Sequence, residues 1–150
     1  MTHSHLRQLF RQNHFFIWLP PLVYYGLVSF FSSLSADEIL VSYPFPGFDK
    51  LIHFLEYGIF AVFVMRAVSW EKYLHHASRL YWGCAVLLIG VAAGLDEYHQ
   101  AFVGGRDSSF YDWLADMGGG VLFLIAGRLL YKRHMRKILE MDSDHKAVAL

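Results

Sequence analysis

Acidic and imidazole side chains recur at helical spacing in this sequence. Asp49, His53 and Glu56 are four and three residues apart, so an α-helix would place them on one face. Asp112 and Asp116 are four residues apart and would share a face in the same way. Carboxylates and an imidazole held close together can bind a metal ion, act as general acid and base, or bind a polar ligand.

Two further segments extend this set of residues. Glu97 and Gln100 are three residues apart, and the segment 103–111 that follows them is short, polar and glycine-bearing. This segment carries Arg106, whose guanidinium can form paired hydrogen bonds with a carboxylate or a phosphate. The candidate binding residues are Asp49, Lys50, His53, Glu56, Tyr57, Glu97, Gln100, Arg106, Ser109, Asp112 and Asp116.

These residue types leave both catalysis and metal binding open. The candidates for catalysis are His53, Glu97, Arg106 and Asp112. The carboxylates that could bind a divalent cation are Glu97, Asp112 and Asp116. The sequence contains no nucleophile elbow, HExxH motif or P-loop, so no familiar reaction is indicated, and no cofactor is identified beyond that candidate cation.

The composition indicates an integral membrane protein. The chain has 150 residues, of which 55% are hydrophobic and 17% charged, with a mean hydropathy of +0.32. A soluble domain usually carries roughly 25% charged residues. The high hydrophobic and aromatic content excludes disorder, the single cysteine excludes a disulfide scaffold, and the net charge of zero gives no basic surface for nucleic acid.

The apolar stretches predict an all-α, polytopic membrane protein built as a four-helix bundle. A helix needs about 20 apolar residues to cross a bilayer. A soluble bundle is the alternative, but four such helices would leave too little polar surface. The first span could also be a secretory signal peptide, although it is longer than the usual apolar region of one. The predicted spans are Phe15–Leu34, Phe48–Val68, Leu80–Leu95 and Trp113–Tyr131, within a membrane domain at 15–131 between an N-terminal segment, 1–14, and a basic tail, 132–150.

The span lengths place carboxylates inside the membrane. Between Arg79 and Asp96 there are sixteen uncharged positions, which cover about 24 Å of a core that is ~30 Å thick. Between Asp116 and Arg128 there are only eleven. Arginine can extend to the interface, but Asp and Glu are too short to do so. The acidic residues predicted to lie in the outer part of the membrane are Glu56, Glu97, Asp112 and Asp116, and such groups normally face a partner inside the bundle. Gly119 and Gly120 follow them and allow helices to approach closely.

The charges also predict an orientation. Eleven of the thirteen Lys and Arg residues fall on the side of the membrane that holds both chain ends. The formal charges on that side sum to +7, and those on the other side sum to −7. Because positive charge collects on the cytoplasmic side, both termini are expected in the cytoplasm and the acidic side outside.

The order and spacing of the polar residues resemble the VanZ-like family of small bacterial membrane proteins. The matching segments are Asp49-Lys50-x-x-His53-x-x-x-Tyr57, then Glu97-x-x-Gln100, then Arg106-x-x-Ser109-x-x-Asp112-x-x-x-Asp116-x-x-Gly119. The resemblance covers residues 15–131. It implies a bacterial cytoplasmic membrane protein, and the founding member is associated with low-level resistance to teicoplanin, whose target lies at the outer face of that membrane. One departure is Asp116, where relatives commonly have asparagine.

Three functions are compatible with these residues. The first is binding of a lipid or a lipid-linked cell-wall head group, with Arg106 and Lys50 on its phosphate. The second is an enzyme acting on such a lipid, with His53 or Glu97 as general base. The third is cation or proton handling, since carboxylates in a membrane must be protonated, paired or metal-bound. A purely structural alternative is that Arg106 pairs with Asp112, and His53 with Glu56, to hold the helices together. The oligomeric state is not indicated.

Overall fold

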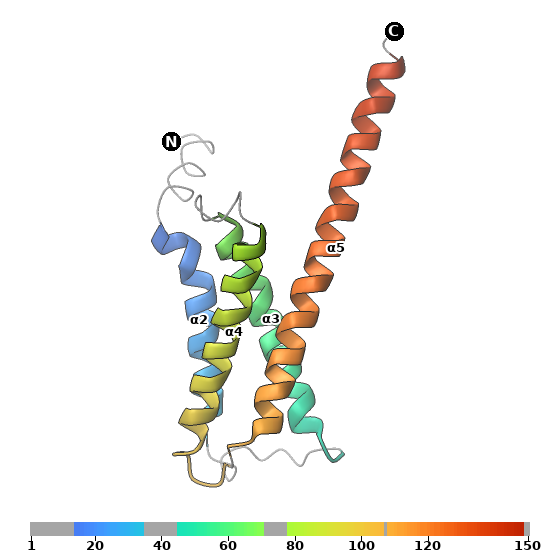
Figure 1. Cartoon of the computed structure of the whole chain (residues 1–150). Coiled ribbons are helices and arrows are strands. Elements are labelled where there is room, and N and C mark those ends of the chain that lie inside the picture. Colours follow the sequence, from blue (N-terminus) through green and yellow to red (C-terminus); the bar gives the residue numbers. More distant parts are fainter. Residues whose placement is uncertain (1–13, 35–44, 71–77, 107, 149–150) are drawn as a thin grey trace.

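Four α-helices make up the computed structural model over the residues that it describes, 14–34, 45–70, 78–106 and 108–148. They are α2 His14–Ser32, α3 Phe48–Trp70, α4 Ser78–Gln100 and α5 Phe110–Val148 (Figure 1). All four contain a segment long and apolar enough to cross a membrane: His14–Ser32, Phe48–Ser69, Leu80–Gln100 and Phe110–Tyr131. The predicted all-α fold with four candidate spans is confirmed.

Large apolar side chains cover the outside of the bundle. Leu22, Leu87 and Leu130 are each more than 60% exposed, and all four helices carry further exposed Phe, Leu, Ile or Val side chains. Contiguous apolar surface of this extent is unfavourable in water and suits contact with lipid chains. The exposed faces therefore support the assignment of these helices as membrane spans.

Helices α4 and α5 extend beyond the predicted spans on both sides of the loop that joins them. Helix α4 continues past Leu95 to Gln100, and α5 begins at Phe110, three residues before the predicted start. Ser109 caps α5, because its Oγ accepts a hydrogen bond from the backbone N–H of Tyr111 at 3.2 Å. Helix α5 also continues without interruption from the predicted membrane domain into the predicted basic tail. Most of the predicted N-terminal segment, residues 1–13, lies outside the described part of the chain.

The helix termini gather at two ends of the bundle (Figure 1). One end holds the C-termini of α2 and α4 and the N-termini of α3 and α5. We call it the acidic end, defined by Asp49, Asp96, Glu97, Asp112 and Asp116, which all lie in the helix turns nearest to it. The cationic part of α5 extends beyond the other helices at the opposite end. The fold thus brings the candidate residues of three helices to one end.

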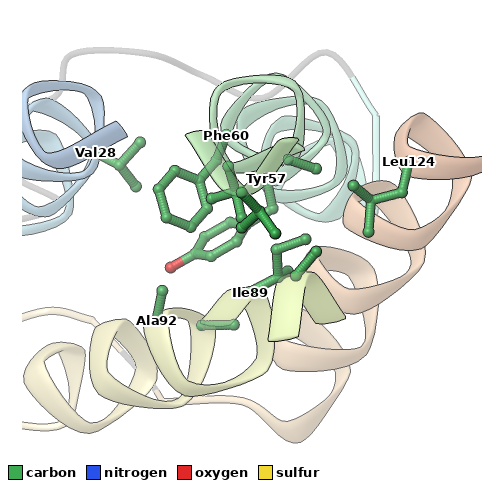
Figure 2. Close-up of a cluster of buried hydrophobic side chains, with 11 residues drawn as sticks. Val28, Tyr57, Phe60, Ile89, Ala92 and Leu124 are labelled. Atoms are coloured by element: carbon green, nitrogen blue, oxygen red, sulfur yellow. The ribbon is translucent and has the colours of Figure 1, made fainter. Parts of the chain in front are cut away.

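Helix α3 is the central element, since it packs against each of the other three helices. Its side chains Tyr57, Phe60 and Val64 are buried against Ile89 of α4 and Leu124 of α5, among others. Figure 2 shows Tyr57 and Phe60 reaching from α3 into the space between α2 and α4. This apolar core lies beside the candidate site and positions α3 relative to its neighbours.

Two consecutive glycines let α5 fit between α3 and α4. A Cβ atom at Gly119 would overlap the backbone of Phe54 on α3, including its carbonyl oxygen. A Cβ atom at Gly120 would lie 2.7 Å from the Cγ2 atom of Ile89 on α4. The close approach expected from these glycines is confirmed, and at Gly119 it is an approach of helix backbone to helix backbone.

Substitution of Gly119 tests this packing. Gly119→Ala is expected to lower the free energy of unfolding by about 1–3 kcal/mol, because the helices must separate to admit the methyl group. The measurement is unfolding of the purified protein in mixed detergent micelles. Gly118→Ala is the matched control, since a Cβ there would meet the Phe54 ring only at 3.7 Å, an ordinary contact. Equal stability of the two variants would contradict the proposed contact.

Candidate functional site at the acidic end

A buried histidine–carboxylate pair joins α3 to α5. The Nδ1 atom of His53 lies 3.1 Å from Oδ1 of Asp116. His53 is 7% exposed and Asp116 is fully buried. Phe54 is the next residue after His53, and Gly119 lies one turn after Asp116, so the backbone contact described above holds the two side chains within reach.

Glu97 of α4 completes a group of three. One potential ligand atom from each of His53, Glu97 and Asp116 lies within 4.8 Å of the other two, and all three residues are buried. The Oε2 atom of Glu97 accepts a hydrogen bond from the backbone N–H of Ser109 at 2.7 Å. The residue that caps α5 therefore also orients the Glu97 carboxylate. We call His53, Glu97 and Asp116 the triad.

A lysine bridges two carboxylates beside the triad. Lys50 Nζ lies 2.8 Å from Oδ1 of Asp112 and 2.9 Å from Oδ2 of Asp49. The Lys50 side chain is 41% exposed, whereas the Asp112 side chain is 9% exposed. Lys50 and Asp49 are partly exposed and Asp112 is buried, so these three residues form the rim of the site, in which the lysine charge is already shared between two acids.

A second buried cluster lies between α2 and α4, and sequence reasoning missed two of its members. Oδ2 of Asp96 accepts hydrogen bonds from Ser32 Oγ at 3.0 Å and from Gln100 Nε2 at 3.1 Å. Asp96 is only 1% exposed. The spacing of four between Asp96 and Gln100 was a usable signal in the sequence, whereas a serine within an apolar span gave none.

Arg106 lies in the loop between α4 and α5, at the acidic end. Its Nε donates a hydrogen bond to the backbone carbonyl of Leu34 at 3.2 Å, just beyond the C-terminus of α2. Among the described residues it forms no ion pair with a carboxylate, and Asp112 pairs with Lys50 instead. The alternative structural pair of His53 with Glu56 is also wrong, since His53 pairs with Asp116.

Glu56 and Tyr57 lie one turn further along α3 from His53. The Glu56 side chain is half-buried, and its backbone carbonyl accepts a hydrogen bond from the Tyr24 hydroxyl at 3.2 Å. Tyr57 is 1% exposed and its ring belongs to the apolar core. Glu56 and Tyr57 thus lie where α3 passes from the triad to the apolar core.

Four buried polar atoms of this region have no hydrogen-bond partner among the described residues. They are Tyr57 OH, Asp96 Oδ1, Glu97 Oε1 and Asp116 Oδ2. Buried polar atoms are nearly always paired, because each one left unpaired costs about 1–3 kcal/mol. Three of the four belong to carboxylates, which accept hydrogen bonds or bind cations when ionised. The arrangement therefore suits a bound group that donates hydrogen bonds or carries positive charge.

A sequence profile of the VanZ/LLP1 family matches residues 3–131 of the chain. The chain belongs to this family. The resemblance seen in the polar segments is thereby confirmed, and with the four apolar helices it makes the chain a multi-pass membrane protein. Comparisons with curated proteins and with solved structures found no significant match.

The residues on which the VanZ/LLP1 resemblance rests are the residues of this site. The polar segments that carry the resemblance lie on α3, on α4, and in the loop before α5 together with the first turns of α5, and the fold brings them to the acidic end. Asp116, the departure from the expected pattern, is the residue that pairs with His53. A carboxylate here replaces the neutral amide expected of relatives, so the pair can carry charge.

Two pairs that join the same helices allow a matched comparison. The His53–Asp116 pair is buried and the Lys50–Asp112 pair lies at the partly exposed rim. Double-mutant cycles with His53→Gln and Asp116→Asn are expected to give a coupling energy of about 1–3 kcal/mol. Cycles with Lys50→Met and Asp112→Asn are expected to give about 0.2–1 kcal/mol, because water screens that pair. Unfolding in mixed micelles measures both, and a rim coupling as large as the buried one would contradict the placement.

Proposed function

We propose that the acidic end binds the polar head group of a lipid or lipid-linked envelope molecule. The observation that carries this proposal is the group of four buried polar atoms without partners at one end of four apolar helices. A head group that brings hydroxyl or amine donors would satisfy these atoms. Its acyl or prenyl chain would lie against the apolar outer faces of the helices.

Exposed aromatic side chains mark the level of this site relative to the membrane. Tyr98, Phe102, Phe110 and Tyr111 are each about 70% exposed and flank the loop between α4 and α5. Aromatic residues are enriched at the boundary between lipid and water. Their position supports a site at the level of lipid head groups.

Arg106 is the cation best suited to a phosphate in this site. Lys50 already shares its charge between two carboxylates, whereas among the described residues the Arg106 side chain makes a single hydrogen bond, to a backbone carbonyl. Its guanidinium therefore keeps donors for a phosphate. It lies three residues before Ser109, whose N–H binds Glu97, so one loop connects the phosphate-binding group to the triad.

Lipid that copurifies with the protein tests this function. We expect mass spectrometry to find a phosphate-bearing lipid or lipid-linked head group on the wild-type protein purified in mild detergent with a chelator. Arg106→Gln is expected to lower its occupancy at least tenfold, while Arg136→Gln, an exposed control near the opposite end, should leave it unchanged. A folded wild-type protein that carries only bulk lipid, in the proportions of the membrane, would contradict the proposal.

Catalysis on the bound molecule is a second candidate function, favoured by the His53–Asp116 pair. A carboxylate that orients an imidazole is a common arrangement for a general base. In the same mass spectrometry, a reaction product that forms with wild-type protein and disappears in His53→Gln would favour the enzyme over the binding protein.

We also propose that both termini lie in the cytoplasm and that the acidic end faces outside. The exposed cations Arg133 and Arg136 support this orientation, because they lie on α5 beyond its span at the opposite end from the triad. In a Cys84→Ser background, a membrane-impermeant maleimide should label Gly104→Cys in intact cells and Arg136→Cys only after permeabilisation. The reverse pattern would contradict the orientation.

An association with teicoplanin resistance enters this proposal through family membership alone. The target of teicoplanin lies at the outer face of the cytoplasmic membrane, the face at which the proposed head-group site would lie. A shared location at this face would connect the site to that association.

A further inference from the structure

We propose that His53, Glu97 and Asp116 form a binding site for a divalent transition-metal ion such as Zn²⁺ or Mn²⁺. Each residue comes from a different helix, α3, α4 and α5 respectively. Their potential ligand atoms lie within 4.8 Å of one another. An ion bound here would join the three helices at the acidic end.

The spacing suits ligands around one ion. Metal–ligand bonds to imidazole nitrogen and carboxylate oxygen are about 2.0–2.2 Å long, so neighbouring ligand atoms lie roughly 3–4 Å apart. His53 Nδ1 and Asp116 Oδ1 are already 3.1 Å apart. Glu97 needs only a small side-chain adjustment to reach the same ion.

The unpaired atoms of the triad point independently to a ligand. Glu97 Oε1 and Asp116 Oδ2 have no hydrogen-bond partner among the described residues, although both residues are more than nine-tenths buried. The other oxygen of Glu97 is held by the Ser109 N–H. Carboxylate ligands are commonly oriented in this way, with one oxygen hydrogen-bonded to the protein and the other on the metal. An ion bound by Glu97 Oε1 and by both oxygens of Asp116 would satisfy both unpaired atoms, and the lone pair of His53 Nδ1 would bind the ion in place of its present contact with Asp116 Oδ1.

The donor set selects the class of ion. One imidazole with two carboxylates suits Zn²⁺, Mn²⁺ or Fe²⁺, whereas Ca²⁺ and Mg²⁺ prefer ligands that are all oxygen. Three protein ligands also leave coordination positions for oxygen atoms of a further molecule. The sequence predicted Glu97, Asp112 and Asp116 as the carboxylates that could bind a cation. In the structure Asp112 pairs with Lys50, and His53 joins Glu97 and Asp116 in the group of potential ligands.

This inference uses two of the four unpaired atoms that also support the head-group proposal, but the two can be tested separately, because an ion can bind to the delipidated protein. The experiment uses the full chain in detergent, stripped of metal and freed of bound lipid, and titrates it with Zn²⁺ and then Mn²⁺ by calorimetry. We expect one site per chain. Glu97→Gln and Asp116→Asn should each weaken the affinity 10- to 100-fold, whereas Asp112→Asn, the control carboxylate next to the triad, should change it less than threefold.

A measurement on the wild-type protein keeps the test independent of variant folding. X-ray absorption spectroscopy of the chain loaded with one Zn²⁺ should show a single imidazole together with oxygen ligands. Two or more imidazoles would place the ion on other histidines and overturn the proposal. Failure of folded wild-type protein to bind either ion, or equal loss of affinity in Asp112→Asn, would also overturn it. In each of these cases, lipid that still copurifies with the metal-free protein would support the head-group proposal.

Discussion

The contact between the backbone of Phe54 and Gly119 sets the distance between α3 and α5, and the polar site depends on that distance. A side chain at position 119 would force the helices apart. His53 and Asp116 lie beside this contact on the two helices and meet at 3.1 Å. The same close approach buries the pair, and neither residue is more than 7% exposed. One glycine thus links helix packing to the chemistry of the site.

The polar groups are concentrated where a membrane protein can best accommodate them. The outer faces of the helices carry apolar side chains, and the middle of the bundle is filled by residues such as Phe60, Ile89 and Leu124. The buried carboxylates lie instead in the helix turns nearest to one end, at the C-terminus of α4 and the N-terminus of α5. A charged group inside a membrane costs several kcal/mol unless a partner compensates it. Lys50 and the Ser109 N–H compensate part of this cost, and the remaining unpaired oxygens indicate that a bound group supplies the rest.

Sequence reasoning predicted the four spans and the faces on which the polar residues lie, because both follow from periodicity along a single helix. It placed His53, Glu97 and Asp116 at one end, and it identified Gly119 as a position of close approach. It did not predict which side chains pair. Pairing depends on how each helix is rotated about its axis and shifted along it, and apolar periodicity gives little guidance when both the core and the lipid-facing surface are apolar. For this reason the alternative pairing of Arg106 with Asp112 was wrong, and Ser32 was overlooked.

Solid-state NMR of the protein in lipid bilayers, with isotope-labelled histidine, aspartate and glutamate, tests the central claim most directly. That claim is that His53, Glu97 and Asp116 meet inside the membrane domain. The structure predicts through-space cross-peaks from the His53 imidazole to the side-chain carboxyl carbons of both Asp116 and Glu97. Assigned spectra in which the His53 ring contacts neither carbon would contradict the claim.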